Sequence, residues 1–147
     1  MLEDSSILIG THRMVKDLDR ETARISAAYG LTFPQFMVME ALLNKGPMTV
    51  GEIKDVILSS SGTIPVIINN LVKMELVIRV KDPGDQRKSV VTLTEQGREL
   101  IEKICPENEA MYTERFSVWT KEEKKELIRL LSLYRKGLHA KEKESNA

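Results

Sequence analysis

The sequence has a single cysteine, few aromatic residues and no net charge. Cys105 has no second cysteine for an intrachain disulfide, which is typical of a protein from a reducing compartment. Apolar runs stay far below the roughly 20 residues that a membrane span needs, and the acidic start, residues 1–6, lacks the basic segment of a secretion signal. We therefore expect a cytoplasmic protein with no membrane association.

The residues that enzymes use are also sparse. There are two histidines and one cysteine, and they do not have the spacing of metal ligands. The chain has no glycine-rich phosphate loop and no Ser, His and Asp grouping that predicts a catalytic centre. The sequence therefore predicts no enzyme, no metal and no cofactor.

The charged residues make up 30% of the 147 residues and the aromatic residues 5%. This balance favours a helix-rich fold over a β-sandwich. Basic and acidic residues are equal at 22 each, unlike the strong excess of base in many nucleic-acid-binding domains. Residues 60–98 alone carry six basic and four acidic residues, so charge is only a weak argument for nucleic-acid binding.

The helix signals divide the first half of the chain into four predicted helices. Ser5 or Ser6 can cap the first, which an apolar stripe extends to a C-terminal cap at Gly30. Capping-box patterns at residues 32–35 and 49–52 open the second and third helices. We expect these to end near Asn44 and Leu58, and a fourth helix to run from Thr63 to about Met74.

After the fourth predicted helix, the spacing of the apolar residues changes from a helical period to that of β-strands. Residues 77–81 and 89–93 are β-prone, and the polar turn 82–88 joins them, so they predict a two-stranded β-hairpin. Thr94 can cap the next helix, which we expect Pro106 to bend or break. A capping box at residues 120–123 opens the last helix, and residues 141–147 are expected to form a frayed polar tail.

This order predicts a mainly α-helical, winged helix-turn-helix protein. In such a fold the fourth helix fits the major groove of DNA and the hairpin wing reaches a neighbouring groove or the backbone. Hydroxyl groups start the fourth helix, asparagines follow on its outward face, and basic residues mark the hairpin tip, where Asp85 can hold Arg87. The expected DNA-binding residues are Ser60, Ser61, Gly62, Thr63, Pro65, Val66, Asn69, Asn70, Lys73, Asp85, Arg87 and Lys88.

Each of these signals has a plainer interpretation. A serine run before a helix is usually a cap, an asparagine pair is usually solvated, and a polar hairpin tip is often only a soluble turn. Their order and spacing together are more specific than any one of them. A winged-helix module that binds protein and not DNA remains the alternative.

Residues 49–100 resemble the core of the multiple antibiotic resistance regulator (MarR) family of bacterial-type regulators. The resemblance is carried by Ser60-Ser-Gly-Thr-Ile64, Leu76-Val-Ile-Arg79, Asp82-Pro-Gly-Asp-Gln-Arg87 and Val91-Thr-Leu-Thr-Glu-Gln-Gly97. The order of the flanking helices matches too. The resemblance implies a helical homodimer with two winged lobes that binds operator DNA, and that most often represses transcription until a phenolic or lipophilic ligand, or thiol oxidation, releases the DNA.

Three positions depart from the family pattern. Glu75 stands where the family often has glycine, which costs about 1 kcal/mol if the backbone there is left-handed. Pro65 stands where many relatives have a polar side chain, so it removes a possible base contact. The first helix has no cysteine, so a peroxide-sensing thiol in that helix is not supported, and we expect Cys105 to be structural.

The resemblance also implies how residues 1–147 are organised as a single domain. Residues 32–98 form the DNA-binding lobe, and residues 1–30 and 99–140 supply dimerisation helices, although these could instead pack on their own chain. The expected dimer contacts are Ile7, Met14, Leu18, Leu127, Leu131 and Tyr134. The expected effector-binding residues are His12, Arg13, Phe36, Met37 and Glu40, although the plainer interpretation makes His12 a surface residue and Met37 a core residue.

Overall fold

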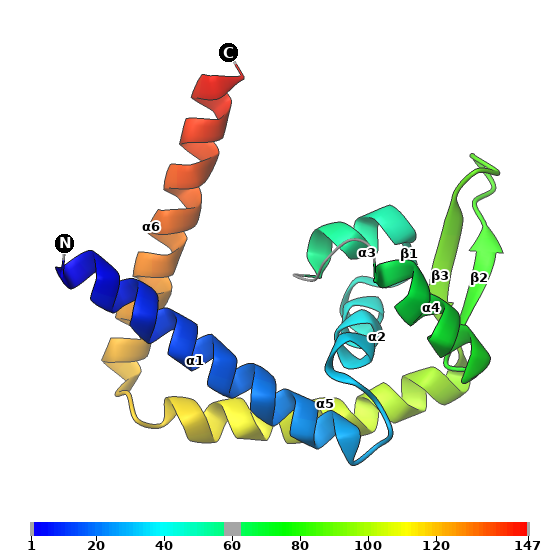
Figure 1. The fold of residues 1–147 in the computed structure, drawn as a ribbon, viewed down its shortest axis with the longest axis horizontal. Helices are drawn as coiled ribbons and strands as arrows, with labels where there is room; N and C mark the ends of the chain where they lie inside the picture. The colour runs from blue at the N-terminus through cyan, green and yellow to red at the C-terminus, as the bar shows by residue number, and fades with distance from the viewer. Residues whose placement is uncertain (1, 58–62, 147) are drawn as a thin grey trace. The chain divides into compact units, whose positions relative to one another are not determined.

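The computed structural model describes residues 2–57 and 63–146, and these residues form six helices and three short strands (Figure 1). The chain divides into two compact units, Met1–Glu109 and Ala110–Ala147. The mainly helical winged-helix fold predicted from the sequence is confirmed. In chain order the elements are α1 (Leu2–Ala27), α2 (Phe33–Lys45), β1 (Met48–Thr49), α3 (Val50–Val56), α4 (Ile64–Lys73), β2 (Val77–Lys81), β3 (Ser89–Leu93), α5 (Glu95–Phe116) and α6 (Lys121–Ser145).

Helix caps fix most of these boundaries. Thr32 and Thr120 both form the predicted capping box, in which each threonine hydroxyl accepts from the third residue of its helix and that residue's side chain accepts in return. Gly30 has φ 81°, and Leu31 donates a hydrogen bond back to the Ser26 carbonyl oxygen at 3.0 Å. This left-handed turn closes α1 and leads the chain directly into α2.

The predicted cap of the first helix is wrong. The helix begins at Leu2, and Ser6 lies inside it. The Ser6 hydroxyl donates to the Leu2 carbonyl oxygen at 2.7 Å. A serine inside a helix can bond in this way to the carbonyl four residues earlier, so its presence near a helix start does not prove that it is the cap.

The sheet contains the predicted hairpin and one strand more. β2 and β3 have the predicted bounds and pair antiparallel, with Val77 opposite Leu93 and Lys81 opposite Ser89. The predicted hairpin is confirmed, and β1, which the sequence did not predict, pairs with the other edge of β3 and gives the order β1-β3-β2. A strand of two residues has no sequence period that could reveal it.

The core of the first unit lies around α2, which contacts α1, α3, α4 and β3. Phe36, Met39 and Leu42 on α2 are almost completely buried. Other elements contribute one to three of the apolar side chains named below, and these branched residues fill the space between the helices and the sheet. They are Ile53, Ile57, Ile64, Ile68, Leu71, Leu76, Val77, Val91, Ile101 and Ile104.

Two expectations about the C-terminal helices are corrected. α5 continues through Pro106 as one helix, so of the bend or break expected there the break does not occur. Buried side chains on both sides of the proline, Ile104 and Asn108, keep the two parts of the helix packed. α6 continues to Ser145, so the polar residues after Lys141 are helical and not frayed. No helix within residues 2–57 and 63–146 combines the length and apolar character needed to cross a membrane.

Candidate nucleic-acid interface

The helix α4 has one buried and one exposed face. Its buried face carries Ile64, Ile67, Ile68 and Leu71, as the sequence predicts. The expected DNA-binding residues of the helix lie on the other face. Val66 is 58% exposed, and Asn69, Asn70 and Lys73 are exposed.

The start of this helix is described only in part. Ser60, Ser61 and Gly62 lie outside the described residues, and Thr63 is exposed at the N-cap of α4. Pro65 occupies the first turn, as predicted, and is half-buried. A proline there needs no partner for a backbone N–H, so it rigidifies the helix start without the loss of a helical hydrogen bond.

Aspartates shape the tip of the wing. Asp82 Oδ1 accepts a hydrogen bond from the Gly84 backbone at 2.9 Å, and Asp85 Oδ1 accepts one from the Arg87 backbone at 3.0 Å. The contact between Arg87 Nε and Asp85 Oδ1 is long, at 3.5 Å, and the Arg87 side chain is 93% exposed, so this ion pair is weak. Asp85 therefore fixes the turn and leaves the guanidinium available for a partner.

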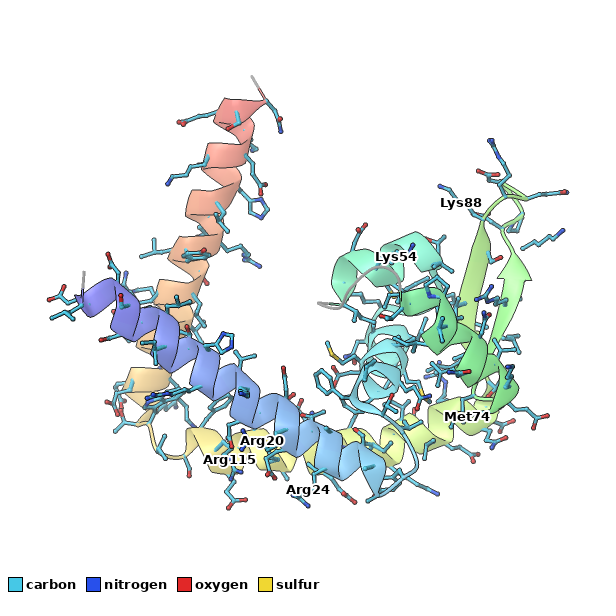
Figure 2. All side chains as sticks on the ribbon, in the orientation of Figure 1. Arg20, Arg24, Lys54, Met74, Lys88 and Arg115 are labelled. Atoms are coloured by element: carbon cyan, nitrogen blue, oxygen red, sulfur yellow. The ribbon has the colours of Figure 1, made fainter. Side chains whose placement is uncertain are left out.

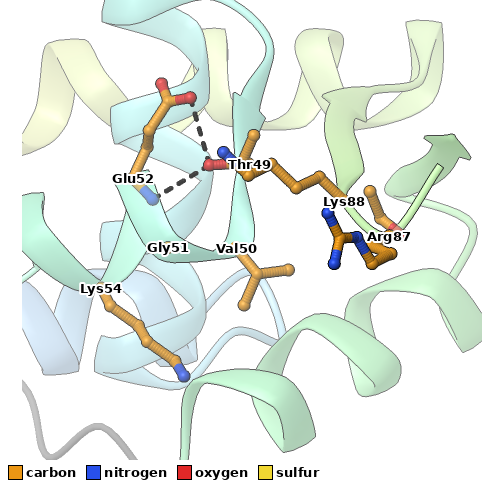
Figure 3. A pocket seen from close by; sticks show the side chains of 8 residues that line it. Thr49, Val50, Gly51, Glu52, Lys54, Arg87 and Lys88 are labelled. Atoms are coloured by element: carbon orange, nitrogen blue, oxygen red, sulfur yellow. Dashed lines mark hydrogen bonds between the residues drawn. The ribbon is translucent and has the colours of Figure 1, made fainter. Parts of the chain in front are cut away.

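A groove lies between the start of α3 and the tip of the wing. Figure 2 labels Lys54 on α3 and Lys88 at the wing tip, the two lysines that lie on opposite sides of this groove. In the close-up, the Lys88 side chain extends toward Thr49, and the Arg87 guanidinium turns toward Val50 (Figure 3). The groove has a volume of about 530 Å³ and is lined by Thr49, Val50, Gly51, Glu52, Lys54, Arg87, Lys88 and Ser89.

A second groove, of about 510 Å³, separates α4 from β2 and is lined by Asn69, Val72, Lys73, Ile78 and Arg79. It brings the predicted Asn69 and Lys73 next to Arg79, which was not selected as a site residue. Lys54 was also missed. The signal for Arg79 was a basic residue on the exposed edge strand β2, whereas nothing local distinguished Lys54 from other surface lysines of a helix.

The five expected effector residues are not brought together in either groove. His12 and Arg13 are exposed on α1, whereas Phe36 is 1% exposed in the core. Met37 and Glu40 are half-buried on α2. Burial, and then the neighbouring Glu109 carboxylate, raise the pKa of Glu40.

Cys105 is half-buried on α5, near Glu40. Burial, followed by the carboxylates of Glu40, Glu109 and Glu102, raises the pKa of its thiol to about 11. The thiolate is the reactive form of cysteine. The surroundings of Cys105 thus oppose the ionisation that reactivity requires.

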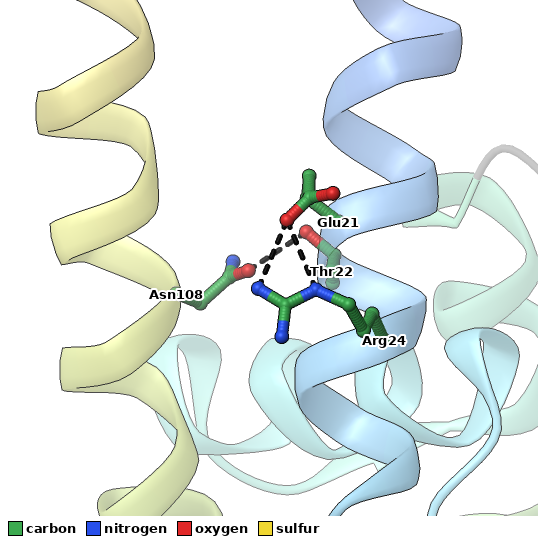
Figure 4. Close-up of polar contacts among 4 residues, drawn as sticks. All are labelled: Glu21, Thr22, Arg24 and Asn108. Carbon is green, nitrogen blue, oxygen red and sulfur yellow. Dashed lines mark hydrogen bonds and ion pairs between the residues drawn. The ribbon is translucent and has the colours of Figure 1, made fainter.

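The helices α1 and α5 are joined within the first unit by polar contacts. The buried Thr22 hydroxyl donates to Asn108 Oδ1 at 2.7 Å (Figure 4). Further along, the Tyr29 hydroxyl donates to the Glu107 carboxylate. Beside the first contact, Arg24 pairs with Glu21 on α1 itself. The Thr22 bond fixes the C-terminal half of α1 against α5, and the Tyr29 bond fixes the turn that follows α1.

The N-terminal half of α1 exposes apolar residues. Ile7 is 64% exposed, with Leu2, Leu8, Ile9 and Val15 at 47–77%. Met14 and Leu18 are half-buried. Within the second unit, Leu131 and Tyr134 of α6 are 54% and 71% exposed, and Leu127 is half-buried. All six expected dimer contacts therefore remain at least partly accessible in the single chain.

No group of three or more His, Cys, Asp or Glu side chains within residues 2–57 and 63–146 is placed to hold a metal ion. The polar residues of α4 and the wing are instead spread over an exposed surface. Such a surface suits a large polar partner better than a small enclosed ligand.

Comparison with known proteins agrees with this geometry. The model of the family described as Transcriptional regulator SarA/Rot matches residues 22–104. The chain is 36% identical to the HTH-type transcriptional regulator MhqR of Bacillus subtilis (strain 168), over 78% of this chain and 77% of that protein.

Solved structures show the same fold. A MarR-like transcription regulator from Bacillus cereus ATCC 10987 has a TM-score of 0.82 at 21% identity, over 94% of this chain and 99% of that one. NadR in complex with 4-hydroxyphenylacetate has a TM-score of 0.75 at 26% identity, over 88% and 92%. The chain belongs to the SarA/Rot family of transcriptional regulators and is a DNA-binding, MarR-type winged helix-turn-helix protein.

Proposed function

We propose that the chain binds operator DNA with α4 in the major groove and the β2–β3 wing against the adjacent backbone or minor groove. The observation that carries this assignment is the exposed row on α4, where Val66, Asn69 and Lys73 face away from the core. Asparagine can pair with both the N6 and N7 atoms of adenine, and lysine can pair with guanine or a phosphate. The exposed Arg87 at the wing tip suits a narrow minor groove.

The operator-binding form is a homodimer in this proposal. Ile7, Leu131 and Tyr134 are more than half exposed, and large apolar side chains gathered on helices favour association. A two-fold dimer presents two copies of α4, so it matches a palindromic operator whose half-sites are about 34 Å apart.

The proposed effect is repression that a small aromatic ligand relieves. The support is the likeness to NadR, a protein whose structure holds 4-hydroxyphenylacetate. A ligand that binds better to a dimer with the wrong spacing between its α4 helices lowers operator affinity by its preference for that state. Phenols and hydroxylated aromatic acids are therefore the first compounds to test.

The test is an electrophoretic mobility shift with promoter DNA from the protein's own locus. We expect a specific complex with a dissociation constant of about 10 nM or tighter, which unrelated competitor DNA displaces only at a large excess. Failure to retain DNA even at low salt contradicts the proposal and favours the winged-helix module that binds protein. In that case, an affinity purification with the folded chain identifies the protein partner.

A further inference from the structure

We propose that the groove between α4 and the outer edge of β2 binds an extended acidic segment of another protein, which joins the sheet as a fourth strand. In strand addition, main-chain hydrogen bonds to an exposed sheet edge give affinity, and alternate side chains give specificity. The groove has a volume of about 510 Å³ and is lined by residues of both the helix and the strand. A protein partner at this place is additional to operator DNA.

The outer edge of β2 is open to another strand. β2 lies at the edge of the sheet, in the order β1-β3-β2 (Figure 1). Just after this strand, the Asp82 N–H donates to the Lys88 carbonyl oxygen of the hairpin at 2.9 Å. Because antiparallel bonding alternates along a strand, the main-chain N–H and C=O groups of Arg79 and Lys81 point away from β3. Within residues 2–57 and 63–146, no strand pairs with that edge.

The side chains of β2 form two different rows. Ile78 and Val80 share one face of the strand and are 46% and 51% exposed. Arg79 and Lys81 share the other face and are exposed as well. Apolar side chains exposed on an edge strand are a liability that proteins usually avoid. Their presence here favours a partner that covers them.

The charges around the groove select the kind of partner. Lys73 and Arg79 are among its lining residues, and none of these is acidic. In the part of the chain that the structure describes, no acidic side chain forms an ion pair with Lys73, Arg79 or Lys81. Two copies of β2 paired antiparallel about Arg79 would place like charges opposite each other, which opposes a second copy of this chain as the occupant. An acidic strand is attracted by the same cations.

The alternation of β2 also specifies the side chains of the partner. In the added strand, residues beside Ile78 and Val80 should be apolar, and residues beside Arg79 and Lys81 should be acidic. Val72 of α4 adds a partly exposed apolar side chain to the same groove. The expected segment therefore alternates acidic and aliphatic residues. A DNA backbone has no strand hydrogen bonds or aliphatic side chains to offer, so the groove fits it less well.

The first experiment selects partners without assuming a sequence. A random peptide library displayed on phage is selected on the full chain in the absence of DNA, and each enriched peptide is then tested on Arg79→Glu. Enriched peptides should alternate acidic and aliphatic residues and should lose binding to Arg79→Glu. The matched control is Lys103→Glu, an equal charge reversal at an exposed residue of α5 outside the groove, which should bind the same peptides. Enrichment of basic peptides, or of peptides that Arg79→Glu still binds, contradicts the proposed site.

Amide hydrogen exchange, followed by NMR, tests the added strand itself. On addition of a selected peptide, the amides of Arg79 and Lys81 should exchange about tenfold more slowly or less, because they acquire partners. The Val80 amide already faces β3 and serves as the internal control. N-methylation of the peptide at alternate residues should abolish binding when the methyl groups replace the N–H groups that face β2, and should be tolerated at the residues between. Peptide binding that leaves the exchange of Arg79 and Lys81 unchanged overturns the added strand.

The apolar row gives an independent readout. Ile78→Ser should lower the affinity for a selected peptide about tenfold with little change in melting temperature, because the Ile78 side chain is nearly half exposed. Val118→Ser, at a 77% exposed residue of the second unit, should match the parent protein. Equal affinity of Ile78→Ser and the parent contradicts a strand laid along β2.

The outcomes also distinguish this site from the proposed operator surface. If the parent protein selects no peptide, the groove is not a docking site, whatever the mobility shift shows for operator DNA. If no peptide is selected and Arg79→Gln weakens the complex with duplex DNA, the cations of the groove belong to the DNA-binding surface. If peptides are selected and protect the edge of β2, the site stands even where the chain retains no DNA.

Discussion

The hydroxyl of Thr94 donates a hydrogen bond to the carbonyl oxygen of Glu75 at 2.7 Å, which connects the start of α5 to the turn that follows α4. Glu75 has φ 63°, the left-handed conformation that its departure from the family's glycine raised as a possibility. The Thr94 hydroxyl also accepts from the Gly97 backbone at 3.0 Å. Thr94 thus links two segments: the turn between α4 and the wing, through Glu75, and the first turn of α5, through Gly97.

Glycine at position 75 should stabilise the protein. A left-handed backbone costs a residue with a Cβ atom about 1 kcal/mol more than glycine, and the Glu75 side chain is exposed. We expect Glu75→Gly to raise the melting temperature by about 2–4 °C in a thermal unfolding experiment. The matched control is Glu99→Gly inside α5, which should lower stability by about 0.5–1 kcal/mol. A melting temperature that falls in both variants contradicts the argument.

Alanine at position 97 should have the opposite effect. A Cβ atom on Gly97 would lie 2.0 Å from the Leu76 carbonyl oxygen, so the backbone must move. The carbonyl of Leu76 also accepts from the Thr94 backbone at 3.0 Å, where α4 leads into β2. We expect Gly97→Ala to cost about 1–3 kcal/mol in chemical denaturation and to weaken DNA binding. Gly137→Ala, where the added atom meets nothing within 4 Å, should be neutral or stabilising.

The sequence predicted most helices and strands well because caps, turns and strand patterns each depend on a few adjacent residues. The capping boxes at Thr32 and Thr120 and the bounds of β2 and β3 depend on neighbours in sequence, and all are confirmed. Two of the differences arose where distant packing decides. β1 exists only because Met48 pairs with Val91, far along the chain. Buried neighbours likewise keep α5 continuous at Pro106.

The residues of the candidate DNA-binding site also fall into two groups: those that local patterns predicted and those that only the fold revealed. The helical period placed Asn69 and Lys73 on the exposed face of α4, and the turn residues placed Arg87 at the wing tip. Lys54 and Arg79 entered the site only once the fold set α3 beside the wing and β2 beside α4. Each groove forms between segments that lie far apart in the sequence, so the spacing of residues along the chain could not reveal it.

Cys105 should be unreactive at neutral pH. Since the pKa of its thiol is raised to about 11, only about one molecule in ten thousand carries the thiolate at pH 7. We expect slow alkylation by iodoacetamide that accelerates as pH approaches 11, and Cys105→Ser should retain DNA binding in the presence or absence of peroxide. Release of the parent protein, but not of Cys105→Ser, from DNA by peroxide would falsify a structural role.

The same pKa shift makes a prediction for stability. A group whose pKa is raised on folding favours the folded state below its unfolded pKa, and that contribution disappears as pH rises through the folded value. Part of the stability should therefore be lost between about pH 9 and pH 11. Denaturation of Cys105→Ser over this range should lack that component. An identical pH dependence in both proteins contradicts the shift.

A charge in the proposed dimer contact should separate the subunits. Leu127, Leu131 and Tyr134 share one face of α6, because residues three and four apart lie together on a helix. Leu131 is 54% exposed in the single chain, so Leu131→Asp should fold and yet form a monomer in analytical ultracentrifugation. The control Lys125→Asp alters the opposite face and should remain a dimer. A dimeric Leu131→Asp protein shows that this face is not the contact.

The proposed roles of α4 and the wing should separate in one set of titrations. Arg87 is 93% exposed on the wing tip, where it can meet a phosphate or a narrow minor groove. Arg87→Ala should weaken binding to nearly all sequences and flatten the salt slope by about one unit per lost phosphate contact. Asn69→Ala should instead cost about 1–3 kcal/mol on the preferred operator and relax its sequence preference, with the salt slope almost unchanged.

Two further wing variants refine this test. Lys88→Ala should resemble Arg87→Ala but with a smaller effect, because a flexible ammonium fits a narrow groove less well than a guanidinium. Asp85→Ala should give a mild Arg87 defect, since Asp85 Oδ1 accepts from the Arg87 backbone at 3.0 Å and so holds the turn that carries the guanidinium. Tighter binding by Asp85→Ala means instead that its carboxylate mainly repels phosphate. If Arg87→Ala binds like the parent at every salt concentration, the hairpin is not a DNA-contacting wing, and the alternative of a winged-helix module that binds protein gains support.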